Sequence, residues 1–205
     1  MEYKLILMTA DGFDIEPDVK DSLKYMGIKG GEIPENLKEI FKECLSEYKK
    51  AASYKAVYGF TDVYQNTENE SCLGFCTICS DSLYKNLSDC DRAAVFAATA
   101  GAGVDRLILR YSKISPVHSL VTDCIASSAI EVWCDKVNEK ISEGYKTKPR
   151  FSPGYGGVSL EYQKDVLSFL DAHRKIGITL NDAFMMKPVK SVTAFVGLCE
   201  NLSQI

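Results

Sequence analysis

The sequence lacks long hydrophobic runs, clusters of basic residues and any excess of positive charge. No apolar stretch approaches the roughly 18 residues that a membrane-spanning helix needs, and the apolar run from Leu5 to Met8 is too short for a signal peptide. Lys and Arg number 24 against 28 Asp and Glu, which gives a formal net charge of −4. We therefore expect a cytoplasmic protein that binds neither membranes nor nucleic acid.

Internal repeats, low-complexity tracts and convincing linkers are absent as well. We therefore expect residues 1–205 to form a single domain, with a helical amino-terminal part over about 1–55. Hydrophobic residues make up 46% of the chain, enough to bury a core. Without an export signal, the eight cysteines are expected to be reduced thiols that pack as small hydrophobic side chains.

Hydrophobic periodicity predicts intermixed helices and strands. Helices are expected at 16–27, 34–48, 81–88, 103–111, 115–144 and 160–172. Strands are expected at 56–64, 73–80, 93–100, near Ile178 and at 191–199. The order shows no regular alternation of strand and helix, so we expect an α+β fold with a mixed or antiparallel sheet flanked by helices.

Three cysteines, Cys72, Cys76 and Cys79, have the spacing that holds an iron–sulfur cluster in radical S-adenosylmethionine (AdoMet) enzymes. The alternative is a strand in which Cys76 and Cys79 point to opposite faces, so that the three sulfurs do not converge. Only 126 residues follow Cys79, too few for the barrel of roughly 200 or more residues that such enzymes use. We favour the strand and expect no metal in this chain.

An apolar strand followed by Gly101 and Gly103 resembles a nucleotide-binding turn, and the acid Asp123 follows Gly103 by 20 residues. The third glycine of that fingerprint is absent, because Arg106 occupies its place. Asp123 also falls inside a predicted helix instead of ending a second strand. We favour glycines that permit tight packing between strand and helix.

The segment 144–157 contains two prolines and four glycines and should be irregular. Within it, the guanidinium of Arg150 presents a fork of donors that matches a carboxylate. The backbone from Ser152 to Gly154 can face a ligand, and Tyr155 offers a ring and a hydroxyl. Together these groups suit a zwitterionic amino-acid tail attached to a purine. A structural turn with Arg150 in a salt bridge fits the pattern equally well.

The segment Arg150-Phe151-Ser152-Pro153-Gly154-Tyr155 resembles the Arg-x-x-Pro-Gly-Tyr signature of the AdoMet-binding activation domain of cobalamin-dependent methionine synthase. Further segments resemble this domain or its stand-alone relatives: Ala98–Gly101, Val104–Arg106, Ile176–Leu180, Phe184–Pro188 and Lys190–Val192. The similarity covers roughly residues 73–199 and is weaker before them.

The resemblance implies roles for individual residues. Arg150 would bind the AdoMet carboxylate, backbone groups at Ser152 would hold the adenine, and Gly154 would belong to the same cofactor site. Tyr155 would lie close to the reacting end of the cofactor. The family also uses an acid on the helix before the loop. Glu131 is our candidate, with Ser127 at that position in the alternative register.

The chain also departs from the family pattern. Gly156, Gly157 and Val158 stand where the full-length enzyme has a stretch with proline and cysteine, as in the shorter relatives. The Asp-x-His-x-x-Gly motif that binds cobalamin is absent, since the two histidines, His118 and His173, do not fit it. Cobalamin is therefore expected on a partner, either a corrinoid-binding methyltransferase or a methionine synthase core. A flavodoxin- or ferredoxin-like protein would donate electrons.

The function implied is accessory to a methyltransferase of methionine biosynthesis. The family restores cob(II)alamin, the inactive oxidised form, by one-electron reduction coupled to methyl transfer from AdoMet. A methyl group on a sulfonium needs no acid or base to leave, so a catalytic His/Asp pair is not required. The alternative is a non-catalytic module that docks on a corrinoid protein or assists its assembly.

Overall fold

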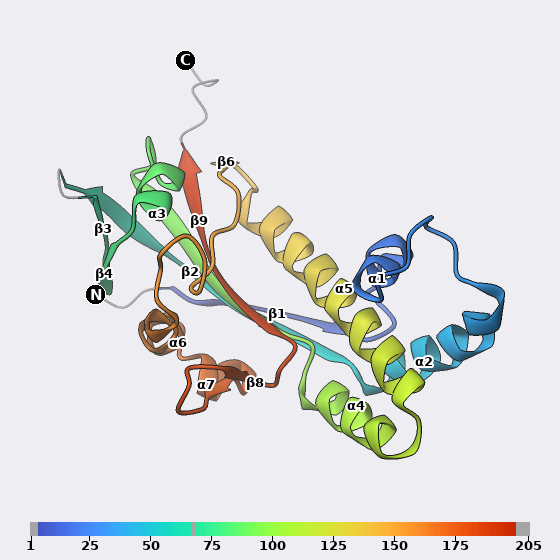
Figure 1. Ribbon diagram of the computed structural model, residues 1–205. Coiled ribbons are helices and arrows are strands. Elements are labelled where there is room, and N and C mark those ends of the chain that lie inside the picture. Colours follow the sequence, from blue (N-terminus) through green and yellow to red (C-terminus); the bar gives the residue numbers. More distant parts are fainter. Residues whose placement is uncertain (1–3, 67–68, 200–205) are drawn as a thin grey trace.

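An antiparallel sheet forms the centre of the molecule in the computed structural model, which describes residues 4–66 and 69–199 (Figure 1). Its strands are β1 (Ile6–Asp11), β2 (Ser53–Gln65), β3 (Glu70–Leu73), β4 (Cys76–Cys79), β5 (Arg92–Thr99), β6 (Lys146–Thr147) and β9 (Ser191–Cys199). Their order is β4-β3-β2-β5-β9-β6, and β1 pairs with β2. All these pairings are antiparallel, which confirms one of the two predicted sheet types.

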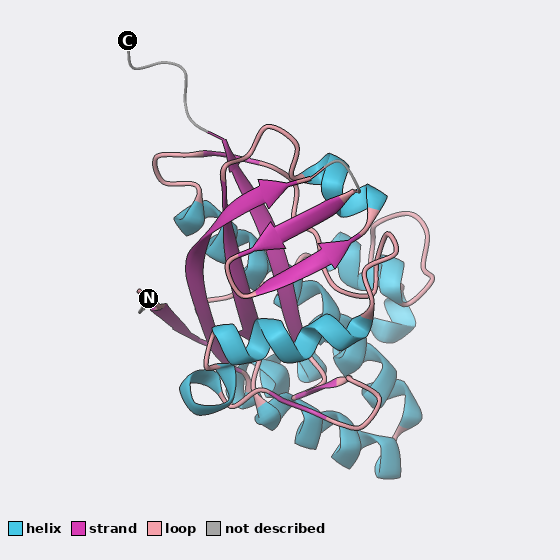
Figure 2. Ribbon diagram, turned by 90° about the vertical axis from the view of Figure 1, so that its left-hand side faces the viewer, coloured by secondary structure: helices cyan, strands magenta, loops and turns pink. Residues whose placement is uncertain are grey.

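Helices cover both faces of this sheet (Figure 2). One face carries α2 (Lys38–Ala51), α4 (Ala102–Ile114) and α5 (Pro116–Ile141), and α1 (Val19–Tyr25) packs against α5. The other carries α3 (Asp81–Asn86), α6 (Gln163–Phe169), α7 (Ala172–Ile176) and a hairpin of β7 (Thr179–Leu180) and β8 (Met186–Lys187). Short 3-10 turns, Glu35–Leu37 and Leu160–Tyr162, precede α2 and α6. The α+β prediction with flanking helices is confirmed.

Strand β5 lies between β2 and β9 and is buried on both faces. Successive side chains of a strand point to opposite faces. Phe96 and its even-numbered neighbours therefore join the core under α5, while Val95 and its odd-numbered neighbours join the core under α6 and α7. The continuous apolar run from Ala93 to Ala98 is typical of such a central strand.

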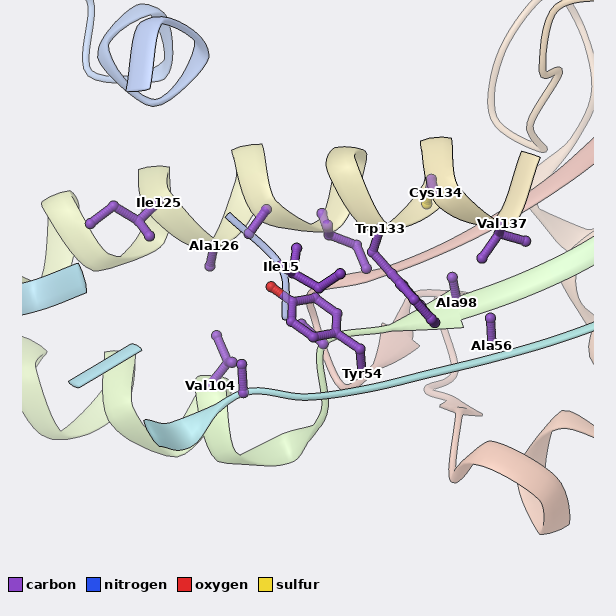
Figure 3. Close-up of a cluster of buried hydrophobic side chains, with 14 of the residues drawn as sticks. Ile15, Tyr54, Ala56, Ala98, Val104, Ile125, Ala126, Trp133, Cys134 and Val137 are labelled. Carbon is purple, nitrogen blue, oxygen red and sulfur yellow. The ribbon is translucent and has the colours of Figure 1, made fainter. Parts of the chain in front are cut away.

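The long helix α5 begins as its sequence predicts. Ser115 is the N-cap, its side chain accepts a hydrogen bond from the backbone N–H of His118, and Pro116 occupies the first turn. Towards the sheet, α5 presents Trp133, whose ring centroid lies 5.7 Å from that of Tyr54 (Figure 3). The Trp133 Nε1–H donates to the carbonyl of Lys55 at 3.3 Å. This packing fixes the rotation of α5 and hence the direction of its outer side chains.

The structure corrects four details of the predicted elements. The amino-terminal part also contains β1, which the uniformly apolar run at Leu5–Met8 did not suggest, because a half-exposed edge strand should alternate. The predicted strand at 73–80 is part of a hairpin, since Gly74 and Phe75 form the turn between β3 and β4. The irregular loop contains β6, and the helix expected at 160–172 is divided among a 3-10 turn, α6 and the start of α7.

Gly103 is explained by packing, as favoured above. A Cβ atom there would lie 2.2 Å from the backbone oxygen of Ala51, at the end of α2. Gly101, with φ of 87°, caps α4 and would place a Cβ 2.9 Å from the backbone oxygen of Ser53. Asp123 lies in α5 and pairs with Lys190 at 2.9 Å. The two glycines thus allow α4 to pass close to the preceding helix and strand.

Replacing Gly103 with alanine should therefore lower the free energy of unfolding by about 1–3 kcal/mol, because backbone atoms on both sides must move apart. Urea denaturation monitored by circular dichroism measures this change in the free energy of unfolding. The matched control is Lys113→Ala on the exposed face of the same helix, which should change stability by no more than about 0.5 kcal/mol. Equal stability of the Gly103 variant and the parent chain would contradict the packing role.

Candidate functional site

The loop that follows α5 is hydrogen-bonded to the edge of β9 that does not pair with β5. Lys146 and Thr147 pair with Cys199 and Leu198, and the Lys148 N–H donates to the carbonyl of Gly197 at 2.9 Å. Farther along, Phe151 and Phe195 exchange two backbone hydrogen bonds of 2.9 and 2.8 Å. These contacts hold Arg150 between two anchored residues, beside the edge of the sheet and next to α5.

The loop then folds into a compact turn. The Gly154 N–H donates to the carbonyl of Val158 at 2.8 Å, and the Val158 N–H donates to that of Tyr155 at 2.9 Å. Gly154 has a φ of 93°, which L-residues rarely adopt. A Cβ at Gly156 would lie 2.6 Å from the ring of Phe151, so this position also requires glycine. The turn leaves the side chain of Tyr155 exposed to solvent, with 75% of the residue accessible.

Arg150 forms ion pairs with two acids of α5. Its NH2 group lies 3.1 Å from Glu131 Oε2, and its NH1 group lies 2.6 Å from Asp135 Oδ1. The arginine side chain is 24% exposed, against 47% for Glu131 and 64% for Asp135. Arg150 and Glu131 are thus brought together, and the salt bridge foreseen for Arg150 is present.

Asp135 is a site residue that the sequence analysis missed. It follows Glu131 by four residues on α5, and residues so spaced lie on one face of a helix. That spacing was visible in the sequence, but only the position of Arg150 shows that both acids face the loop.

Tyr25, at the end of α1, is a second residue that the sequence analysis missed. Burial raises the pKa of its hydroxyl, and the nearby acids Glu131 and Asp21 raise it further, whereas Lys24 lowers it. The electrostatic interaction with Tyr155 also raises the pKa of the Tyr25 hydroxyl. Tyr25, on α1, therefore lies near both Glu131 and the loop residue Tyr155, and both tyrosines are largely exposed. No sequence pattern connects these distant segments.

Ser127 lies one helical turn before Glu131 and has other partners. Its hydroxyl donates to the carbonyl of Asp123 at 2.9 Å and accepts from Lys190 Nζ at 2.8 Å. Lys190 is 12% exposed and also pairs with Asp123. Along α5, one basic side chain is therefore held at Asp123 and Ser127, and the second, Arg150, at Glu131 and Asp135.

The three cysteines of the possible cluster motif lie on the β3–β4 hairpin. Cys76 shares the inward face of β4 with Ile78, and burial raises the pKa of its thiol to about 12. Cys79 lies on the outward face, as does Cys72, which pairs with Thr77. The three sulfurs therefore do not converge, and within 4–66 and 69–199 no group of three or more His, Cys, Asp or Glu residues could hold a metal ion.

Comparisons with known proteins agree with this architecture. A family model described as vitamin B12 dependent methionine synthase, activation domain, matches residues 42–201. A crystal structure of the MetH reactivation domain bound to AdoHcy has a similar fold, with a TM-score of 0.74 and 14% sequence identity. The match covers 98% of this chain and 80% of that one. No curated protein matches the sequence. In the part of the chain that the structure describes, none of the helices has the length and apolar character to cross a membrane.

Proposed function

The chain belongs to the family of vitamin B12 dependent methionine synthase activation domains, and we propose that it binds AdoMet for the reactivation of a separate corrinoid-dependent methyltransferase. The observation that carries this proposal is the position of Arg150, fixed beside Glu131 on the loop that presents Tyr155. The similar fold of a reactivation domain bound to AdoHcy supports the same ligand class.

The paired charges at Arg150 complement the amino-acid tail of AdoMet. A guanidinium has five N–H donors, so Arg150 can donate to a ligand carboxylate while it keeps part of its contact with α5. Asp135 is the more exposed of its two acids and therefore the easier one to displace. Glu131, or the released Asp135, would then face the ammonium group of the tail. Both poles of the zwitterion would be bound by residues that already pair with one another.

The remainder of the ligand would lie against the loop. Backbone groups at Ser152 and Gly154 would hold the adenine. The ring of Tyr155 would lie against the sulfonium, where a cation and an aromatic face attract each other. Tyr25, which interacts with both Glu131 and Tyr155, would border the same surface. Because Tyr155 is exposed, the methyl group would remain open to a partner that approaches from solvent.

The reaction joins three components at this open face. AdoMet, cob(II)alamin on the partner and one electron yield methylcobalamin and AdoHcy. The electron would come from a flavodoxin- or ferredoxin-like donor. This chain would contribute the binding and orientation of AdoMet, which would present the methyl group to the partner's cofactor.

Calorimetric titration of the isolated chain with AdoMet tests the first part of this proposal. We expect one binding site per chain, and AdoHcy should occupy the same site and compete with AdoMet. AdoHcy lacks the positive sulfonium, so it should bind more weakly if Tyr155 contacts that charge. A folded chain that takes up neither compound would contradict the proposed function.

A further inference from the structure

Two of the eight cysteines are in direct contact. Cys90 lies in the bend before β5, and Cys199 ends β9. The antiparallel register pairs Arg92 with Leu198, so the bend before one strand lies beside the end of the other. The two sulfur atoms are 3.1 Å apart. Cys90 is 6% exposed, whereas Cys199 is partly exposed.

The space for this contact depends on Gly197. A Cβ at Gly197 would lie 2.8 Å from the sulfur of Cys90 and 3.1 Å from side-chain atoms of Leu87 and Lys148. The turn that carries Cys90 is fixed by a hydrogen bond of 3.1 Å from its N–H to the carbonyl of Leu87. A side chain at position 197 would therefore displace the Cys90 thiol from its present position.

We propose that Cys90 and Cys199 are a dithiol that oxidises to an intramolecular disulfide, with a small-molecule disulfide such as oxidised glutathione as the oxidant. The Cys199 thiolate attacks the oxidant, forms a mixed disulfide and releases one glutathione thiolate. The Cys90 thiol then loses its proton and attacks the Cys199 sulfur, which releases the second. Two protein thiols and one oxidised glutathione give one protein disulfide and two reduced glutathiones.

The order of these steps follows from exposure. Cys199 is the thiol that a solvent-borne oxidant reaches, and Cys90 lies in the position to resolve the mixed disulfide. Burial and the adjacent Cys199 raise the pKa of the Cys90 thiol to about 12, although the nearby charge of Lys148 lowers it. Because the thiolate is the nucleophile, ring closure should become faster as the pH rises.

The disulfide would restrain the base of the loop that carries Arg150. Cys199 pairs with Lys146, and Lys148 is bonded to the carbonyl of Gly197 on the same strand. A covalent link from Cys90 to Cys199 would tie the end of β9 to the bend before β5, and so would limit fraying of the strand end to which β6 and Lys148 are hydrogen-bonded. Oxidation should therefore slow hydrogen exchange at the amide of Lys148.

The test oxidises the unaltered, folded chain with glutathione disulfide, blocks remaining thiols and maps disulfide peptides by mass spectrometry. We expect a peptide pair that links Cys90 to Cys199, loss of this pair on reduction, and slower exchange at Lys148. The link should disappear in Cys90→Ser and persist in the control Cys72→Ser/Cys79→Ser, which removes two thiols outside the pair. Circular dichroism verifies that both variants are folded.

Two outcomes would overturn the proposal. The first is a folded, oxidised chain in which Cys90 and Cys199 both remain free to alkylation. The second is oxidation that links Cys90 and Cys199 to other cysteines as often as to one another. AdoMet binding has no part in this measurement, so its result is independent of the proposed function.

Discussion

Replacement of Arg150 with alanine should weaken AdoMet binding by about ten- to a hundredfold, the equivalent of roughly 1.5–3 kcal/mol for a lost charge-assisted contact. Methylthioadenosine lacks the carboxylate, so its affinity should hardly change. Isothermal titration calorimetry with both ligands measures the difference. The two compounds share the methylthioadenosine skeleton, so the comparison isolates the amino-acid tail and the positive charge on sulfur, of which the carboxylate is the group that an arginine binds.

The ion pairs of Arg150 in the free protein make stability a necessary control. The variant leaves Glu131 and Asp135 without their shared cation, but both acids are well exposed, so the cost in folding free energy should be small. Arg174→Ala is the matched variant, since Arg174 also pairs with an acid, Asp171, at 3.3 Å, and lies outside the loop. It should bind both ligands as the parent chain does.

Other outcomes would assign Arg150 a different role. Equal weakening of AdoMet and methylthioadenosine would show that Arg150 does not hold the carboxylate. Unchanged affinity for both, in a folded variant, would leave Arg150 with the structural salt bridge alone.

The parts of the fold that the sequence predicted well are those in which local pattern and burial coincide. The apolar run from Ala93 to Ala98 in β5 is typical of a strand in the centre of a sheet, and Ser115 with Pro116 marks the start of α5. In both cases the signal is contained in neighbouring residues, so tertiary contacts had little to add.

The parts that were missed depend on contacts between distant segments. β1 is an edge strand whose Leu7 stays 53% exposed, so its hydrophobic residues do not mark a buried face. The turn at Gly74 and Phe75 divides a run of β-formers that is otherwise continuous. Short strands of four residues give too little periodicity to locate such a turn.

The candidate site likewise contains residues that the local sequence identified and residues that only contacts between distant segments reveal. The loop from Arg150 to Tyr155 was identified from its residues, and the structure brings Glu131 to Arg150. Asp135 and Tyr25 were missed because their membership depends on the rotation of α5 and the placement of α1 against it. Helix rotation is fixed by buried packing, chiefly at Trp133, and no local motif reports it.

Omission of this chain from a reactivation assay should abolish the formation of methylcobalamin. The assay combines the cognate corrinoid protein in the cob(II) state, AdoMet and a low-potential electron donor, and follows the cobalamin spectrum. The expectation follows from the proposed function, in which this chain would supply AdoMet and the partner would supply the cobalamin. With AdoMet alone, the chain should release neither methionine nor a methylated product, because the methyl group has no acceptor.

Tyr155→Phe distinguishes a contributing site from a passive scaffold in this assay. The variant should retain part of the activity, since the exposed ring survives while its hydroxyl is lost. Tyr64→Phe is the control, because Tyr64 is similarly exposed, at 69%, but lies on β2 near the hairpin, and it should retain full activity. If the cognate partner is reactivated equally well without this chain, the proposed function is wrong. Stable binding to that partner would then favour the docking module, because the chain would contact the corrinoid protein without delivering a methyl group.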